Sequence, residues 1–143
     1  MRLVLVRHAS AGERAKWIGD DRLRPLDERG RRQAAGLVAP LTTAGVDRLL
    51  SSPYVRCVET LEPAAAGLGL PVEEDDALAE GARAGEVRAL LEGLSGSTPA
   101  LCTHGDVVEA LLGEELGLKK GAARVLALDG GELRLGDKIP PPA

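Results

Sequence analysis

Short apolar runs alternate along this chain with longer segments in which apolar residues recur every three or four positions. The short runs, bounded by Gly, Pro, Asp and Ser, predict strands that are buried on both faces of a sheet. The longer segments predict amphipathic helices. Strands are expected at residues 3–6, 46–50, 71–73 and 100–103, a hairpin at 124–128 and 132–135, and helices at 27–41, 53–66, 85–94 and 106–116.

Polar residues, prolines and glycines at the ends of the periodic segments set the expected helix boundaries. Asp27 and Asp106 are predicted N-caps, and Ser52 followed by Pro53 predicts an N-cap and a first helical residue. Gly67 is predicted to end the second helix as its C-cap. The helices at 53–66 and 106–116 therefore each start three residues after a strand ends.

This alternation predicts an α/β fold, specifically a three-layer α/β/α sandwich with a mostly parallel sheet and an antiparallel edge strand. The 143 residues are enough for one domain with a substantial core. We expect that domain to cover residues 1–139. Residues 140–143, which include three consecutive prolines, are expected to form a disordered tail.

Composition and charge narrow the classes of partner. The net charge of −4, without a long basic run, argues against a nucleic-acid partner, which needs a wide positive face. No apolar stretch approaches the length of a membrane span, and the first residues enter a strand without a signal-peptide pattern, so we expect a cytoplasmic protein without a membrane partner. Cys57 and Cys102 are too few for a disulfide framework, and Cys102 reads as a small core residue.

The only two histidines, His8 and His104, each follow a predicted buried strand, and Arg7 precedes the first of them. Arg56 falls in the first turn of the helix that follows a third strand. In open α/β sheets the loops at the carboxyl ends of parallel strands form the ligand crevice. Positive groups gathered there beside a helix N-terminus predict a site for a phosphate dianion.

Four segments resemble the histidine phosphatase superfamily, whose fold is called phosphoglycerate mutase-like. They are Val-Arg-His-Ala-Ser at residues 6–10, the stretch from Arg24 to Ala34, the Ser-Ser-Pro-Tyr-Val-Arg stretch that starts at Ser51, and Thr-His-Gly at residues 103–105. The similarity covers almost the whole chain, and its segments occur in the order of the family. One position departs from the family pattern, because Ala9 stands where the family usually has glycine. If that position requires a positive φ, alanine would cost about 1 kcal/mol.

The resemblance implies a metal-independent phosphatase without a cofactor, working through a phosphohistidine at His8. The adjacent cation of Arg7 is expected to depress the imidazole pKa and keep the ring neutral, as a nucleophile must be. The implied phosphate-binding groups are Arg7, Arg56 and His104, with His104 also catalytic. Glu80, in the Leu-Ala-Glu-Gly segment at residues 78–81, is the implied general acid, with a solvated loop glutamate as the alternative.

Other side chains near these motifs have two interpretations each. Ser10 either donates a hydrogen bond to the phosphate or caps a turn. The basic residues between the first strand and the first helix either hold a second anionic part of the substrate or form a solvated charged loop, which their interleaved acids favour. They are Arg14, Lys16, Arg22 and Arg24.

The chain looks most like the small phosphohistidine phosphatases of the superfamily, so a phosphorylated protein is the first expected substrate and a small phosphorylated molecule the second. A resemblance to the phosphatase half of two-domain Nudix proteins suggests nucleotide-type phosphates as the alternative. A metal hydrolase using His8, His104 and Asp106 is a rival, although two fixed arginines would repel a divalent cation. An inactive phosphate-binding module is a further alternative, for which Ala9 is the only indication.

Overall fold

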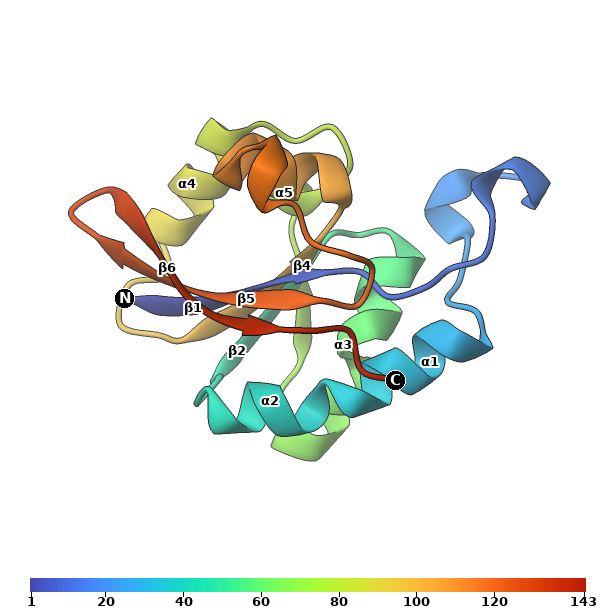
Figure 1. Cartoon of the computed structure of the whole chain (residues 1–143), viewed down its shortest axis with the longest axis horizontal. Helices are drawn as coiled ribbons and strands as arrows, with labels where there is room; N and C mark the ends of the chain where they lie inside the picture. Colours follow the sequence, from blue (N-terminus) through green and yellow to red (C-terminus); the bar gives the residue numbers. More distant parts are fainter.

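A six-stranded mixed sheet forms the middle layer of the molecule in the computed structural model, which describes all residues from Met1 to Ala143 (Figure 1). The strand order is β3-β2-β4-β1-β5-β6. The central pairs β1–β4, β2–β4 and β2–β3 are parallel, and β5 and β6 add an antiparallel hairpin beside β1. The strands are β1 (Arg2–Arg7), β2 (Arg48–Ser51), β3 (Val72–Glu74), β4 (Pro99–Thr103), β5 (Ala123–Asp129) and β6 (Glu132–Ile139).

Helices cover both faces of this sheet (Figure 1). One face carries α4 (Ala84–Glu92) and α5 (Gly105–Leu112), and the other carries α1 (Glu28–Gly36), α2 (Val38–Thr43) and α3 (Val55–Leu68). The predicted three-layer α/β/α sandwich with a mostly parallel sheet is confirmed. Single turns of 3₁₀-helix lie at Arg14–Lys16, Asp21–Leu23, Asp76–Leu78 and Glu114–Leu116.

The chain has no phenylalanine, and its two cores are built from leucine, valine, alanine and cysteine. Leu3 and Leu5 of β1 face α4 and α5, whereas Val4 and Val6 face the helices on the opposite side. This alternation follows from the period of two along a strand. Because β1 is buried on both faces, its carboxyl end is held rigidly, and that end carries Arg7 and His8.

Several predicted helix boundaries were wrong. Residues 27–41 were expected to form one helix, but α1 ends at Gly36 and α2 begins at Val38. Pro40 has no backbone N–H, so a continuous helix would leave the Gly36 carbonyl without its donor. The N-cap Asp27 was predicted correctly, and its side chain accepts a hydrogen bond from the Gly30 N–H at 2.7 Å.

The boundaries of α3 and α5 also differ from the prediction. The N-cap of α3 is Tyr54 rather than Ser52, and its C-cap is Gly69, with a left-handed φ of 68°, rather than Gly67. The N-cap of α5 is His104 rather than Asp106, and this helix ends at Leu112 instead of continuing to residue 116. Arg56 does lie in the first turn of α3, as predicted.

The last four residues follow β6 without regular secondary structure, and Pro142 lies against Gly36 of α1. The single-domain boundary at residue 139 and the disorder of the tail stay predictions. None of the helices has the length and apolar content that crossing a membrane requires.

Candidate active site

The pairing register of three parallel strands brings the predicted site residues together. Arg7 at the end of β1 pairs with Thr103 at the end of β4, and Ser51 at the end of β2 pairs with Cys102. The hydrogen bonds continue one residue further, because the His8 N–H donates to the Thr103 carbonyl at 3.0 Å. His8, Ser52 and His104 therefore leave the sheet side by side at one edge.

His8 is held in one tautomer by the backbone beside it. Its Nδ1 lies 2.8 Å from the carbonyl oxygen of Ala9. A carbonyl only accepts hydrogen bonds, so Nδ1 must carry the proton and Nε2 is left with the lone pair. The side chain is largely buried, with the residue 5% exposed, but it still lines a cavity at this edge of the sheet.

The electrostatic surroundings of His8 keep the imidazole neutral. Burial is the largest influence and lowers the pKa of His8 to about 3. The charges of His104, Arg56 and Arg7 act in the same direction, in that order of size. The sequence predicted the direction correctly but attributed it to the adjacent Arg7, which contributes least of the three. The reason is that desolvation depends on packing, which a sequence neighbour does not reveal.

Ala9 fits its position without backbone strain. No residue other than glycine has a positive φ, so the conformation here does not require the usual glycine of the family. The Ala9 side chain is fully buried, and its N–H donates to Thr60 Oγ1 at 3.0 Å. The Thr60 hydroxyl in turn donates to the Arg56 carbonyl at 2.7 Å, which ties the β1 loop to α3. The backbone strain expected if this position required a positive φ is therefore absent.

His104 packs against the start of α3 and lies next to His8. The two imidazole rings are 5.4 Å apart between centroids. His104 Nε2 lies 2.8 Å from Ser52 Oγ and 3.5 Å from Cys57 Sγ, whereas Nδ1 is buried without a partner. Although His104 is the N-cap residue of α5, its side chain makes no capping hydrogen bond to that helix. Its unpaired Nδ1 is the atom left to meet a ligand.

Ser52 positions His104, a role that the sequence did not reveal. It was predicted to cap α3, and its Oγ does accept a hydrogen bond from the Tyr54 N–H at 3.2 Å. The same oxygen also lies against the buried imidazole of His104. The Ser52–Pro53 pair could be recognised in the sequence. Its contact with His104 could not, because Ser52 follows β2 and His104 follows β4.

The guanidinium of Arg7 is packed against the first residue of α5. A Cβ at Gly105 would lie 2.9 Å from Arg7 Cζ, so only glycine leaves room for this approach. One terminal nitrogen, NH1, donates to the Leu118 carbonyl at 2.8 Å, and Nε is buried without a partner. Arg7 thus retains an unused donor next to the start of a helix.

Arg56 is fully buried, and its terminal nitrogens are already bonded. NH1 donates to the backbone oxygen of Asp21 at 2.8 Å, NH2 donates to the Asp21 carboxylate at 3.0 Å, and Nε is buried without a partner. Burial opposes ionisation of Asp21, but Arg24, Arg56 and Arg14 together hold the pKa of its carboxyl below the ordinary value. The terminal nitrogens of Arg56 are therefore bonded to Asp21. The sequence had led us to expect them to be free to bind phosphate.

Glu80 lies at the cavity wall, as the resemblance implied, and is one-third exposed. Its carboxylate accepts a hydrogen bond from Arg14 and lies 3.9 Å from Arg56 NH2. The next residue is anchored as well, because the Gly81 N–H donates to Asp106 Oδ2 at 2.8 Å. A carboxylate held at the wall of a cavity that contains a neutral imidazole is suited to moving a proton.

Ser10 points away from His8. Its hydroxyl donates to Asp27 Oδ2 at 2.7 Å and its N–H donates to Gln33 Oε1 at 2.9 Å. Both donors expected for the phosphate are therefore used to hold the loop against α1. With both donors engaged, Ser10 has none left for the phosphoryl group, and we do not assign it there.

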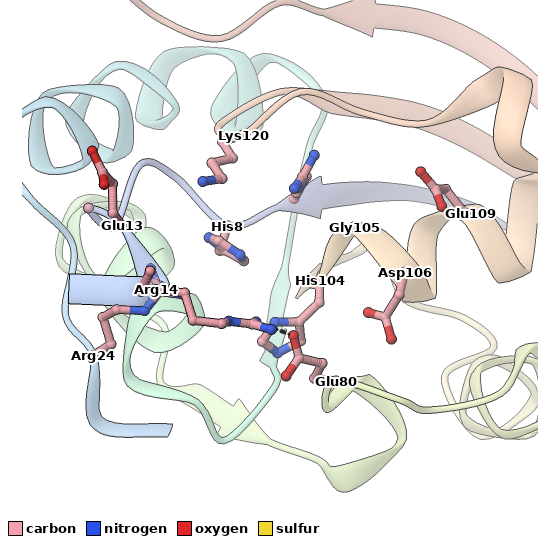
Figure 2. Close-up of a pocket in the computed structure, with 13 residues that line it drawn as sticks. His8, Glu13, Arg14, Arg24, Glu80, His104, Gly105, Asp106, Glu109 and Lys120 are labelled. Carbon is pink, nitrogen blue, oxygen red and sulfur yellow. Dashed lines mark hydrogen bonds and ion pairs between the residues drawn. The ribbon is translucent and has the colours of Figure 1, made fainter. Parts of the chain in front are cut away.

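The cavity itself has a volume of about 690 Å³ and is lined almost entirely by polar and charged groups (Figure 2). Figure 2 shows His8 in its centre, His104 and Glu80 on one side and Lys120 opposite them. Arg24, expected in a solvated loop, is instead 6% exposed and donates to Asp21 and to the Ala11 carbonyl. Sequence reasoning missed Lys120, because it stands in a stretch without a motif.

The structure offers no support for the rival metal site. His8, His104 and Asp106 do not form a ligand cluster, and no group of three or more His, Cys, Asp or Glu side chains is placed to hold a metal ion.

Comparisons with known proteins match this chain to phosphatases. The family description "Histidine phosphatase superfamily (branch 1)" matches residues 3–86. An 8-oxo-(d)GTP phosphatase of Mycolicibacterium smegmatis is 40% identical over 98% of this chain and 48% of its own length. The chain thus spans about half the length of this curated relative.

Two solved structures show how widely the architecture is shared. The protein histidine phosphatase SixA, solved with tungstate, has a TM-score of 0.83 and 25% identity over 99% of this chain and 97% of its own. A mycobacterial glucosyl-3-phosphoglycerate phosphatase, solved with VO3, has a TM-score of 0.77 over 99% of both chains. Its 20% identity supports a shared fold alone.

Proposed function

Because this chain belongs to the histidine phosphatase superfamily, we propose that it is a phosphatase that works through a phosphohistidine formed at His8. The observation that carries the proposal is the state of that imidazole. Its Nδ1 is bonded to the Ala9 carbonyl and its pKa is about 3, so Nε2 has a free lone pair at neutral pH. A neutral nitrogen in a cavity that Arg7 and Lys120 also line is suited to attack phosphorus.

In the first step Nε2 of His8 attacks phosphorus and the bond between phosphorus and the leaving group breaks. Glu80 gives its proton to the leaving atom. In the second step water attacks the phosphohistidine, Glu80 takes a proton from that water, and the bond between phosphorus and Nε2 breaks to release inorganic phosphate. Two displacements retain the configuration at phosphorus.

Charge on the transferring phosphoryl group needs donors that are already in place. The buried, unpartnered nitrogens at the site are Arg7 Nε, Arg56 Nε and His104 Nδ1. We assign the phosphoryl oxygens to these three side chains. For Arg56 to use its terminal nitrogens as well, a phosphate oxygen must replace the carboxylate of Asp21.

The substrate class is a separate part of the proposal. Phosphohistidine in proteins, or another phosphomonoester, is the first candidate, because the compact chain matches a protein histidine phosphatase over nearly its full length. Nucleotide-type phosphates are the second candidate, and the 40% identical relative, named as an 8-oxo-(d)GTP phosphatase, supports them. We further propose that catalysis needs neither a metal ion nor a cofactor.

The test of the mechanism is a phosphoenzyme trapped during turnover of p-nitrophenyl phosphate. We expect a phosphoryl label that is labile to acid and stable to base, absent in His8→Gln and retained in His104→Gln, which should label more slowly. Activity should survive exhaustive chelation and be inhibited by vanadate. Full activity in His8→Gln would refute the nucleophile, and loss on chelation with recovery on adding zinc would favour a metal hydrolase.

The substrate test compares kcat/KM for a phosphohistidine peptide, sugar phosphates and nucleotides. Preference for the phosphohistidine peptide would support the first candidate. Preference for nucleotides would support the second and leave the role of His8 unchanged.

A further inference from the structure

A second cavity, of about 390 Å³, adjoins the one that contains His8. Its walls come from the end of β1, from α1 and from the loop that precedes β5. The two cavities share Arg7 and Lys120, and Figure 2 shows Lys120 on the side of His8 opposite Glu80. The polar residues that line the second cavity are Arg7, Ser10, Arg29, Gln33, Lys119 and Lys120.

The charge in this second cavity is positive and unpaired. Four cationic side chains line it and no acidic side chain does. None of the four takes part in an ion pair, although eight other ion pairs between side chains occur in the protein. Burial, then Arg7 and Arg24, lower the pKa of Lys120. No carboxylate forms an ion pair with these cations, although Asp27, Asp106 and Glu109 act on them from a greater distance, so a bound anion would stabilise the set.

Gln33 adds a neutral donor from the floor of this cavity. The residue is only 2% exposed, and its Oε1 accepts a hydrogen bond from the Ser10 N–H. Its amide NH2 group donates to no protein acceptor, which leaves two N–H donors for a ligand. The hydrogen bond to its oxygen fixes the orientation of this nearly buried amide, so its NH2 group is already oriented to bind a ligand.

Arg7 links this cavity to the reaction. Its guanidinium lines both cavities, and its Nε is buried without a partner. An anion in the second cavity therefore lies next to the phosphoryl group that His8 would attack. Adjacent positions of this kind fit one molecule that carries two phosphate groups better than two separate ions.

We propose that the second cavity binds a second phosphate group of the same small-molecule substrate, so that the protein prefers diphosphates or bisphosphates over the matching monophosphates. This inference rests on the proposed function, since it takes His8 as the nucleophile. Arg29 and Lys119 would contact only the second phosphate, because they line the second cavity and not the first. They determine specificity and take no part in the transfer.

The test uses substrate pairs that differ by one phosphate group, with Arg29→Ala and Lys119→Ala as variants. The pairs are AMP with ADP, for a diphosphate, and propane-1,3-diol monophosphate with its bisphosphate. In each variant we expect kcat/KM to fall about tenfold, mainly through KM, for at least one of the doubly phosphorylated compounds. For the monophosphates it should change less than twofold. The pair that responds identifies the spacing of the phosphates.

Arg32→Ala is the matched control. Arg32 is on the same helix and carries the same charge, but it pairs with Glu28 at 3.2 Å and lies outside both cavities. It should leave all four substrates unaffected. Equal losses for single and double phosphates, no loss for either doubly phosphorylated compound, or an equal effect of Arg32→Ala would each overturn the proposal.

A binding measurement separates this proposal from the proposed function. In the His8→Gln background, calorimetry should show methylenediphosphonate binding more tightly than inorganic phosphate, and Arg29→Ala should remove that preference. If the protein hydrolyses no phosphate but shows this preference, the phosphatase mechanism fails and the second site stands. If it hydrolyses monophosphates through His8 but shows no preference, the second site fails alone.

Discussion

Lowering the pH from 7 to 5 should destabilise this protein through His8. The imidazole pKa is about 3 in the folded protein and 6.5 when unperturbed. Between these values the unfolded chain binds a proton at this position and the folded chain does not, so stability is greatest above pH 6.5 and falls as the pH drops toward 3. At about 1.36 kcal/mol per unit, His8 alone should cost about 2 kcal/mol of unfolding free energy at pH 5.

The assay is urea unfolding at pH 7 and pH 5, in the parent and in His8→Gln. Glutamine cannot titrate, so the variant should lose about 2 kcal/mol less than the parent between the two pH values. NMR gives a second readout, because with only two histidines in the chain His8→Gln assigns both imidazole signals. The His8 signal should not titrate above pH 5.

Two results would refute this reasoning. An imidazole signal of His8 that titrates near pH 6.5 would mean that the ring is not desolvated in solution. Equal pH dependence of unfolding in the parent and His8→Gln would mean that the folded and unfolded states bind the same number of protons at this position.

Three substitutions test the remaining assignments. Glu80→Gln should slow hydrolysis of alkyl phosphates far more than that of p-nitrophenyl phosphate, since a good leaving group needs no acid; equal losses would deny Glu80 the acid role. Arg56→Ala should lower kcat more than tenfold and also lower the unfolding free energy by about 2 kcal/mol, because it removes a fully buried side chain and its two hydrogen bonds to Asp21, which keeps only Arg24 and Arg14 as partners. An unchanged kcat with lost stability would make Arg56 structural. Ser52→Ala should reduce kcat about tenfold with little change in KM, by releasing His104, and Ser52→Thr should restore it.

The order of elements and the position of the reacting groups could be predicted from the sequence, because both depend on local pattern. Apolar runs of four or five residues define strands buried on both faces, and a parallel sheet requires their carboxyl ends to meet at one edge. Arg7 and His8 follow one such run, His104 follows another, and Arg56 begins the helix after a third. Helix ends were less predictable where two glycines stand close together. Gly67 and Gly69 could each end α3, and the structure ends it at Gly69.

Tertiary structure decided the charge state of the site residues and which hydrogen-bond partners they have. The low pKa of His8 comes mainly from burial, and burial depends on packing against segments distant in the sequence. Asp21 bonds to Arg56 from 35 positions away, and Arg7 and Gln33 line one cavity with Lys120 although no motif connects them. Sequence periodicity determines which face of an element is buried. Only the folded chain determines which charges lie within a few ångströms of one another. At that range the charges determine pKa values and which groups are able to bind a ligand.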